Sequence, residues 1–252
     1  MMTLGAQLYT LRDFCRNLDD FAETLKKVAA IGYTDVQVSG TCAYEPAWLA
    51  EQLKKNGLTC SITHTNPNRI ITNTDQVIAD HDVFGCNYIG IGSLPGGVEN
   101  YFGFRDDIRA AAQKIAAAGK TLMMHNHYTE FERSGPDQLN YLEYFMRDFT
   151  AQEIGFTFDT YWAQFAGADP AQWIEKLAGR LPCVHLKDMQ VVRGERKMAP
   201  VGGGNMNFER IVNACANAGT KHLLVEQDDC NGIDPFICLT RSYQYLTSLG
   251  LK

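Results

Sequence analysis

Short runs of apolar residues recur along the whole chain, and each is followed by a polar or glycine-containing segment. An uninterrupted apolar run of this length is typical of a β-strand that is covered on both faces. Glycine and proline residues separate the runs from the segments between them. The pattern predicts strands at Leu4–Tyr9, Tyr33–Val38, Leu58–Thr63, Asn87–Ile91, Thr121–Met124, Ile154–Phe158, Pro182–Val184 and His222–Val225.

The segments between these runs carry apolar residues at helical spacing. In the first segment, Phe21, Leu25 and Val28 fall on one face, and Gly32 marks the end. Pro46 opens the second segment, at a position where a helix favours proline. The expected helices are Asp19–Ala30, Pro46–Lys55, Thr74–Phe84, Phe104–Ala118, Asp137–Phe149, Ala171–Leu177, Phe208–Ala218 and Pro235–Ser248.

Eight strands and eight helices therefore alternate strictly, which predicts an α/β fold with a parallel sheet. A chain of 252 residues divided into eight units gives about 31 residues a unit, enough for one strand and one helix. We expect a (β/α)8 TIM barrel, a single domain spanning residues 1–252. An open doubly wound sheet would carry a Gly-x-Gly-x-x-Gly turn after its first strand, and Thr10–Asp13 lacks it. The polar segment Arg193–Asn205 is expected to be an excursion from the barrel.

Polar side chains with metal-binding chemistry gather at the carboxyl ends of the predicted strands. Four of the six histidines lie there, namely His64, His125, His127 and His185. Asp159 and Glu226 each follow an apolar run directly, where an unpaired buried carboxylate would be costly. Active sites of barrels lie at this end of the strands. The remaining two histidines, His81 and His222, lie within a helix and at the opposite end of the last strand, so we assign them structural roles.

Three of these residues, Asp159, His185 and Glu226, end successive strands, which are neighbours in a barrel. Oxygen and nitrogen ligands of this kind can enclose one divalent cation, and Mn²⁺, Mg²⁺, Co²⁺ and Zn²⁺ all suit them. The simpler alternative is that Lys187 or Arg12 neutralises the carboxylates in a salt bridge. A fourth ligand is expected after the fifth strand, from His125, His127 or Glu130. Since residues two apart on a strand share a face, we expect the two histidines to point inward and Asn126 outward.

Other residues near the strand ends fit a sugar-binding site. Trp162 lies three residues after Asp159, where its ring is suited either to stack on a sugar or to pack in the core. Lys187 and Asp188 follow the seventh strand and are suited either to bind a hydroxyl group or to face solvent. Gly202–Gly204 precedes an expected helix, so its amides are placed to meet an anion, although a flexible lid is the simpler interpretation. Phosphate on the substrate is therefore left open.

Composition excludes several classes of protein. A net charge of −6 argues against nonspecific binding to nucleic acid or to an anionic membrane. No apolar run reaches the ~18 residues of a membrane span, and Met1–Gly5 lacks the parts of a signal peptide, so a cytoplasmic location is expected. The eight cysteines are scattered singly, which indicates reduced side chains packed in the core. Whether copies of the chain form a homo-oligomer is left open.

Several stretches together give the chain a family resemblance, namely Gly5–Asp13, His125–Phe131, Phe158–Trp162, His185–Asp188, Pro200–Gly204 and Val225–Asp228. On these stretches the chain resembles the xylose isomerase-like barrel superfamily, in its sugar phosphate isomerase/epimerase branch. The resemblance covers essentially the whole chain. It implies an eight-stranded barrel with one divalent metal ion, Mn²⁺ being favoured, and it matches Asp159, His185 and Glu226 to the usual ligands.

The sequence also departs from the well-studied keto-sugar epimerases of that branch. Those enzymes carry Glu where this chain has His125, and a substrate-binding His where it has Trp162. Many relatives carry Glu on the second strand at the position of Gln37. A mechanism with two glutamates is therefore not carried over whole, and Glu130 is the carboxylate that can replace the missing one. Relatives with the His-Asn-His pattern of His125–His127 include dehydratase-like and keto-glycoside-processing enzymes.

From these residues we expect a metal-dependent sugar isomerase or epimerase, in which the metal acidifies the proton next to a carbonyl and stabilises the enediolate. Glu226 is the expected base, with Glu130 and His127 as further catalytic residues. Glu130 is also the expected fourth metal ligand, ahead of His125. The substrate, a small keto or aldo sugar, is expected to contact His64, His125, Trp162, Lys187 and Arg12.

Other functions fit the same residues. A lyase or dehydratase acting on a keto-sugar, keto-glycoside or keto-inositol shares the first proton abstraction and then expels a leaving group. A catalytically inactive sugar-binding barrel is the alternative outside enzymes, and retention of the three principal ligands argues against it. An abasic-site endonuclease of the same superfamily is disfavoured by the net charge of −6 and by too few ligands for a cluster of several metals.

Overall fold

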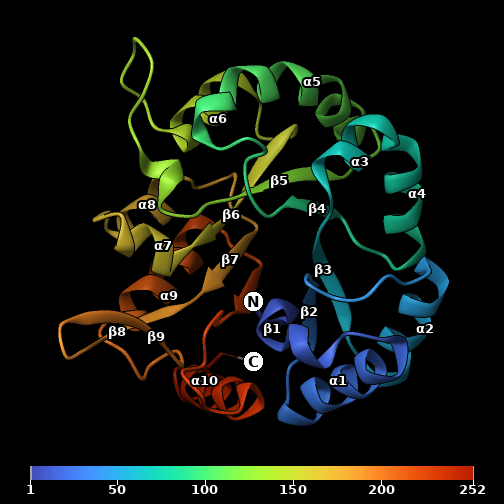
Figure 1. The fold of residues 1–252 in the computed structure, drawn as a ribbon, viewed down its shortest axis with the longest axis vertical. Helices are drawn as coiled ribbons and strands as arrows, with labels where there is room; N and C mark the ends of the chain where they lie inside the picture. The colour runs from blue at the N-terminus through green and yellow to red at the C-terminus, as the bar shows by residue number, and fades with distance from the viewer. Residues whose placement is uncertain (1, 252) are drawn as a thin grey trace.

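The strands close into a parallel barrel in the computed structural model, which describes residues 2–251 (Figure 1). Around the barrel the strand order is β1-β10-β7-β6-β5-β4-β3-β2, and each neighbouring pair is parallel. The predicted α/β fold class and (β/α)8 TIM barrel are therefore confirmed. In chain order the barrel strands are β1 (Thr3–Gln7), β2 (Asp35–Val38), β3 (Thr59–His64), β4 (Tyr88–Ile91), β5 (Thr121–His125), β6 (Ile154–Asp159), β7 (Cys183–Leu186) and β10 (His222–Val225).

The main helices surround the barrel, and local chemistry sets their ends (Figure 1). The Asn17 side chain caps the first helix by accepting a hydrogen bond from the backbone N–H of Asp20 at 3.0 Å. Gly57 ends the second helix in the left-handed conformation, with a φ of 65°. These helices are α1 (Leu18–Ile31), α2 (Pro46–Asn56), α4 (Thr74–Val83), α5 (Tyr101–Ala117), α6 (Tyr141–Asp148), α8 (Pro170–Lys176), α9 (Phe208–Ala218) and α10 (Pro235–Ser248).

The start predicted for the helix at Asp137–Phe149 was wrong. Asn140 and Glu143 form a capping box, in which each side chain accepts from the other residue's backbone N–H at 3.0 Å. This box makes the helix begin at Tyr141, and Gln138 before it turns with a φ of 51°. Shorter helical turns that the pattern did not predict are α3 (Pro67–Thr72), α7 (Thr160–Phe165), η1 (Leu8–Phe14), η2 (Val98–Asn100) and η3 (Thr129–Phe131).

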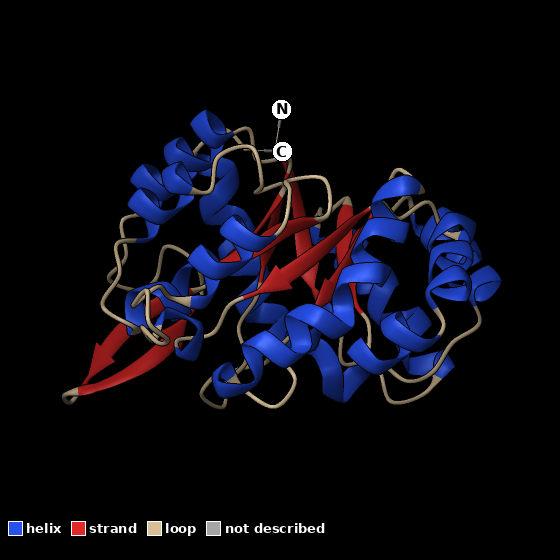
Figure 2. Ribbon diagram, turned by 90° about the horizontal axis from the view of Figure 1, so that it is seen from above, coloured by secondary structure: helices blue, strands red, loops and turns tan. Residues whose placement is uncertain are grey.

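The polar segment after β7 forms an antiparallel hairpin that stands apart from the barrel. β8 (Asp188–Val192) pairs with β9 (Glu195–Ala199) in a separate two-stranded sheet. Arg193 and Gly194 turn the chain with φ angles of 53° and 84°, as a two-residue hairpin turn requires. Figure 2 shows this pair of strands projecting beyond the helices. The excursion predicted at Arg193–Asn205 is therefore present, and it begins earlier, at Asp188.

A thin apolar layer fills the barrel below the carboxyl ends of the strands. This layer consists of the buried residues Ile62, Met123, Cys183 and Leu224. Because side chains two apart on a strand point the same way, the layer lies beneath polar residues two positions further on, namely His64, His125, His185 and Glu226. The barrel is thus a packed core that ends in a polar layer. Among the described residues, no helix is both long and apolar enough to cross a membrane.

Candidate metal centre

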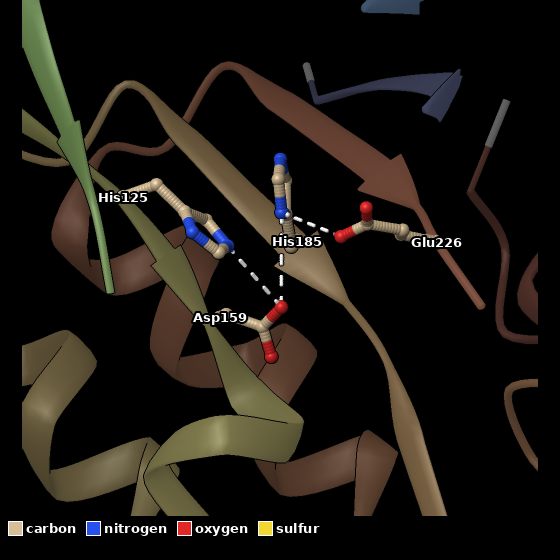
Figure 3. Close-up of side chains that lie close together, drawn as sticks. All are labelled: His125, Asp159, His185 and Glu226. Atoms are coloured by element: carbon tan, nitrogen blue, oxygen red, sulfur yellow. Dashed lines mark hydrogen bonds and ion pairs between the residues drawn. The ribbon is translucent and has the colours of Figure 1, made fainter. Parts of the chain in front are cut away.

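Four buried side chains meet in this polar layer (Figure 3). His125 ends β5, Asp159 ends β6, His185 lies in β7 and Glu226 follows β10. These strands are consecutive neighbours around the barrel, so its closure brings together residues about a hundred positions apart. One nitrogen or oxygen atom from each side chain lies within 4.8 Å of the others.

Each of the two carboxylates has one oxygen held by the protein and one left facing the centre. Oδ1 of Asp159 accepts a hydrogen bond from the backbone N–H of Trp162 at 3.0 Å, as the cap of α7. Oε1 of Glu226 accepts one from Nε2 of Gln7 in β1 at 2.8 Å. The second oxygens, Oδ2 of Asp159 and Oε2 of Glu226, turn toward the histidines (Figure 3).

The two histidines are oriented in the same manner. Nε2 of His185 lies 2.6 Å from Oε1 of Gln37, and Nδ1 of His125 lies 3.0 Å from the backbone oxygen of Gly92. Because both partners can only accept, these ring nitrogens carry the protons. In the neutral rings, Nδ1 of His185 and Nε2 of His125 therefore present lone pairs to the centre. Orientation of metal-binding histidines by such hydrogen bonds is common in metalloproteins.

The four inner atoms fit a divalent cation. Nδ1 of His185 and Oε2 of Glu226 are 2.9 Å apart, yet they are not aligned for a hydrogen bond. Within the described part of the chain, both atoms are buried without a hydrogen-bond partner, although Nζ of Lys187 lies 2.9 Å from Oε2, and a cation that contacts both atoms would satisfy them. Two imidazole nitrogens and two carboxylate oxygens are a donor set that Mn²⁺, Co²⁺ and Zn²⁺ accept. The two carboxylates also balance the charge of one divalent ion.

Lys187 stands beside this group and forms the salt bridge that the sequence offered as the alternative. Its ammonium donates to both oxygens of Asp228 at 3.0 Å, and it lies 3.1 Å from Asp159 and 2.9 Å from Glu226. Only the contacts with Asp228 have hydrogen-bond geometry. Burial alone would lower the pKa of Lys187, but the three carboxylates raise it, so the amine stays charged. Asp228 can therefore keep Lys187 in place when a cation takes up the other two carboxylates.

The pKa values of the four side chains suit a positive charge at the centre. Burial lowers the pKa of His125 to about 4, so its ring is neutral at pH 7. Burial alone would raise the pKa of Asp159 and Glu226, but Lys187 and the histidines hold both well below the usual range. Burial alone would lower the pKa of His185, but Glu226 and Asp159 raise it. The field of the carboxylates thus stabilises a cation beside His185.

A cavity of about 330 Å³ adjoins the four side chains on the carboxyl side of the barrel. Its lining combines imidazole, carboxylate, hydroxyl and backbone groups, which suits a small molecule with many hydroxyls. Glu226 and His125 belong to both the cavity and the four-residue group. The lining residues are Gln7, Tyr9, Arg12, Ser39, His64, Gly92, Ser93, His125, His127, Lys187, Glu226 and Asp228.

Comparison with known proteins agrees with this architecture. A family model described as "Xylose isomerase-like TIM barrel" matches residues 25–235. The chain belongs to the xylose isomerase-like TIM-barrel family. The resemblance found in the sequence is therefore confirmed at the level of the family. No curated protein matches the chain by sequence.

Several solved structures share the fold of this family member. A sugar phosphate isomerase/epimerase from Parabacteroides distasonis is 22% identical, with a TM-score of 0.80 over 98% of this chain and 94% of that one. A protein described as L-ribulose 3-epimerase is 17% identical, with a TM-score of 0.74 over 100% and 95%. A probable 3-DHS dehydratase from Bacillus anthracis is 14% identical, with a TM-score of 0.74 over 98% and 99%. Identities this low establish the common fold alone.

In this xylose isomerase-like barrel, Glu130 lies outside the four-residue group, although the sequence favoured it as the fourth ligand. Its Oε2 accepts hydrogen bonds from the backbone N–H of His127 at 2.8 Å and from the hydroxyl of Thr129 at 3.0 Å. The turn η3 directs the carboxylate back onto its own loop. The geometry thus brings His125 rather than Glu130 to the other ligands.

Asn126, expected to point outward, is not among the residues that line the cavity. Its side chain is buried, and its Oδ1 accepts a hydrogen bond from the backbone N–H of Asp159 at 2.9 Å. His127, expected to point inward, lines the cavity.

The residues expected to contact substrate are spread over the cavity and its rim. His64, His125, Arg12 and Lys187 line the cavity. Trp162 lies at the rim, with its ring 5.5 Å from that of His127 and 5.6 Å from Nζ of Lys187. Its indole Nε1 is buried without a hydrogen-bond partner among residues 2–251. The two histidines with predicted structural roles do not line this cavity. His81 contacts the Thr63 side chain at 2.8 Å, and His222 contacts the Asp35 side chain at 2.9 Å.

The sequence did not identify four residues that shape the site. Gln7 and Gln37 orient two of the ligands, Ser39 contacts Nδ1 of His64 at 3.0 Å, and Asp228 holds Lys187. Burial and Glu226 raise the pKa of Asp228 to about 7, against the effect of Lys187. The available signal was a polar side chain within an apolar strand, since Gln7 and Gln37 both stand in such runs.

Proposed function

We propose that the protein is a metal-dependent isomerase or epimerase of a keto or aldo sugar. The observation that carries the proposal is the arrangement of His125, Asp159, His185 and Glu226, whose inner nitrogen and oxygen atoms converge while their outer atoms are held by the protein, beside a polar cavity. A divalent cation bound there supplies Lewis-acid polarisation of a sugar carbonyl. The carbon next to such a carbonyl becomes acidic enough for a carboxylate to deprotonate.

Glu226 is the proposed base. It is ionised at neutral pH, it lines the cavity, and Gln7 fixes its Oε1 at 2.8 Å. Oε2 accepts no hydrogen bond among the described residues and lies 2.9 Å from Nζ of Lys187, so the cation and the substrate proton would share this carboxylate. Removal of the proton from one face of the substrate, followed by its return, accounts for isomerisation or epimerisation.

His64 and His127 are proposed to hold the sugar hydroxyls. Burial lowers the pKa of His64 well below its usual range, so its ring is uncharged. Nδ1 of His64 lies 3.0 Å from Oγ of Ser39, and Nε2 is buried without a partner in the described chain. His127 lines the same cavity and has a half-buried ring. Each histidine thus offers a polar atom to a hydroxyl of the substrate.

The test is Glu226→Gln, with solvent deuterium exchange as the readout. The amide is nearly isosteric with the carboxylate and keeps a carbonyl oxygen, but it cannot accept the proton. General base catalysis is worth roughly 10²–10⁴-fold in rate, so turnover should fall by about that factor. A panel of keto and aldo sugars is incubated in ²H₂O with Mn²⁺, and deuterium at the carbon next to the carbonyl is measured by NMR. Exchange should disappear together with product formation.

The same experiment distinguishes isomerisation or epimerisation from a second candidate reaction, the elimination of water. His125 occupies the fifth-strand position in the ligand group, which leaves Glu226 as the one carboxylate of that group that lines the cavity. One base with histidine acids suffices to remove a proton and expel a β-hydroxyl. A dehydratase gives a product one water lighter, which mass spectrometry detects. If Glu226→Gln exchanges deuterium at the normal rate, another residue abstracts the proton and the role of Glu226 is wrong.

A further inference from the structure

Part of the region where TIM barrels commonly bind phosphate is occupied by a carboxylate of the protein itself. That region is formed by the loops after the seventh and eighth strands and by the start of a short extra helix. In this chain the loop after the seventh strand ends in Val201–Asn207, which carries Gly202–Gly204 and leads into α9. Successive backbone N–H groups in such a glycine-containing loop form a concave site that suits an anion.

The carboxylate of Asp188 occupies this concave site. Its Oδ2 accepts hydrogen bonds from the backbone N–H groups of Gly202 at 3.0 Å and Gly204 at 2.9 Å. Its Oδ1 accepts from the backbone N–H groups of Met189 at 2.7 Å and Met206 at 3.3 Å. Asp188 is fully buried, and a Cβ at Gly204 would lie 2.5 Å from Oδ1. The amides of Gly202, Gly204 and Met206 are therefore taken by Asp188 and are not available to a phosphate.

The two cationic side chains that line the cavity, Arg12 and Lys187, already have partners within the protein. The Arg12 guanidinium donates to the backbone oxygens of Tyr9 at 2.9 Å and Asp228 at 3.0 Å, and it lies 4.5 Å from the Tyr9 ring. Lys187 is surrounded by the carboxylates of Asp159, Glu226 and Asp228. Two of these carboxylates, Glu226 and Asp228, line the cavity themselves, so a phosphate would have to compete with them for Lys187.

We infer that the substrate is an unphosphorylated, uncharged sugar. The inference rests on the proposed function and narrows its substrate class. The internal carboxylate of Asp188 takes the place of the anion, so the loop is closed without help from a ligand. Recognition then depends on hydroxyl groups, which the histidines and Ser39 of the cavity can bind.

Binding experiments decide the inference independently of turnover. Calorimetry of the Mn²⁺-loaded protein with inorganic phosphate and with D-fructose 6-phosphate should show no binding at millimolar concentration. Binding of either anion at submillimolar concentration, with protection of the protein against thermal unfolding, would overturn it. The variant Asp188→Gly should be less stable than the wild type, and formate should restore part of its melting temperature by filling the vacated amides. Formate should leave the wild-type melting temperature unchanged, and an equal effect on both proteins would contradict the anion-like role of Asp188.

Turnover gives the second measurement. Deuterium exchange is compared between D-fructose and D-fructose 6-phosphate and between D-ribulose and D-ribulose 5-phosphate. The free sugar should be favoured in kcat/KM by about tenfold or more, because a phosphate that finds no unpaired cation in the cavity loses its hydration without compensation. Preference for a phosphate ester would overturn the inference while leaving the proposed chemistry intact. Absence of exchange in all four sugars counts against the proposed function, and the anion-binding measurements then decide the inference by themselves. If Asp188→Gly does not fold, Asp188→Ala, which also vacates the amides but keeps a Cβ, replaces it in the rescue experiment.

Discussion

Hydrogen bonds from outside the group of His125, Asp159, His185 and Glu226 determine which atom of each side chain faces inward. Gln37 is one source of this control, because its Oε1 lies 2.6 Å from Nε2 of His185 and fixes the proton there. The opposite nitrogen, Nδ1, is then the one with a free lone pair. A glutamine in β2 thus sets the chemistry of a histidine in β7 across the barrel.

Gln37→Leu should weaken binding of Mn²⁺ by about 10- to 100-fold, the range typical of changes to residues that orient metal ligands. Leucine cannot accept the proton of Nε2, so the ring of His185 is free to turn. Isothermal titration calorimetry measures the affinity. Gln52→Leu, on the outer helix α2, is the matched control and should leave the affinity unchanged. Equal affinities in both variants would show that Gln37 does not orient His185.

The buried ring of His81 should make the protein less stable at acid pH. Burial lowers its pKa from 6.5 to about 4, and its ring contacts Thr63 and Val77. The unfolded chain therefore takes up a proton below about pH 6.5, whereas the folded chain does so only near pH 4. The contribution of His81 to the free energy of unfolding is fully present above pH 6.5. It is lost as the pH falls through 4, and the loss amounts to up to about 3 kcal/mol.

The measurement is urea denaturation of the wild type and of His81→Gln at pH 7.5 and pH 5.0. Glutamine keeps a hydrogen-bonding side chain but does not titrate, so the variant should lose less stability between the two pH values. The other histidines contribute equally to both proteins and cancel in the comparison. Identical losses would mean that His81 does not take part in acid unfolding.

Among individual residues, the sequence could predict the positions of those site residues whose placement depends only on the order of the strands. Asp159, His185 and Glu226 each follow an apolar run directly, so their meeting point follows from the barrel. The position of Glu130 could not be predicted, because it depends on the single turn η3. The partners Gln7 and Glu226 are 219 residues apart, and no local pattern links them.

Among the elements, β4 shows how a glycine in a strand allows close packing. A Cβ at Gly90 would lie 2.4 Å from the backbone oxygen of Thr63 and 3.1 Å from the ring of His64. Both neighbours belong to β3, which pairs with β4. The absence of a side chain at this position therefore sets how closely the two strands approach and where His64 lies.

Gly90→Ala should destabilise the protein by about 1–3 kcal/mol, as overpacking of a core commonly does. Gly103→Ala in α5 is the matched control, because its Cβ would approach closely only the flexible side chain of Asn100. That change should stabilise the protein by roughly 0.5–1 kcal/mol, since glycine is unfavourable within a helix. Chemical denaturation measures both, and a loss of stability in the control would show that the close contact in β4 is not the cause.

Hydrophobic periodicity predicted the existence of the main helices and strands, and capping decided their ends. The start of α6 shows the difference: Asp137 fits the helical pattern, but Asn140 and Glu143 place the first turn later. The short helices α3 and α7 escaped prediction because each has only six residues, too few to establish a period. Asn66 and Asp159, which cap them, were the local signals available.

On the scale of the whole molecule, the barrel and the β8–β9 hairpin are separate sheets. The strict alternation of strands and helices was sufficient to predict the barrel, because eight such units favour closure. The hairpin could not be inferred from that alternation. Its one clear signal was the Arg193-Gly194 pair, whose positive φ angles make a tight turn between β8 and β9.

Shortening the hairpin should therefore leave the barrel intact. Deletion of Val191, Val192, Glu195 and Arg196 keeps the turn at Arg193 and Gly194 and the phase of the pairing. The interactions that this deletion removes lie near the surface, and they include the hydrogen bond from Arg196 to the backbone oxygen of Phe165. The free energy of unfolding should change by no more than about 1 kcal/mol. A loss of several kcal/mol in urea denaturation would mean that the hairpin belongs to the core.

Closure of the barrel by β10 has a consequence for how the protein is made. β10 pairs with both β1 and β7, so until it leaves the ribosome those two strands have unpaired edges. Translation at about 5–20 residues per second leaves the edges open for many seconds. Glu226 emerges immediately after β10, so the nascent chain cannot bring the four side chains of the proposed metal site together earlier. Until that moment molecular chaperones can shield the open strand edges, and an ion that needs all four side chains cannot bind.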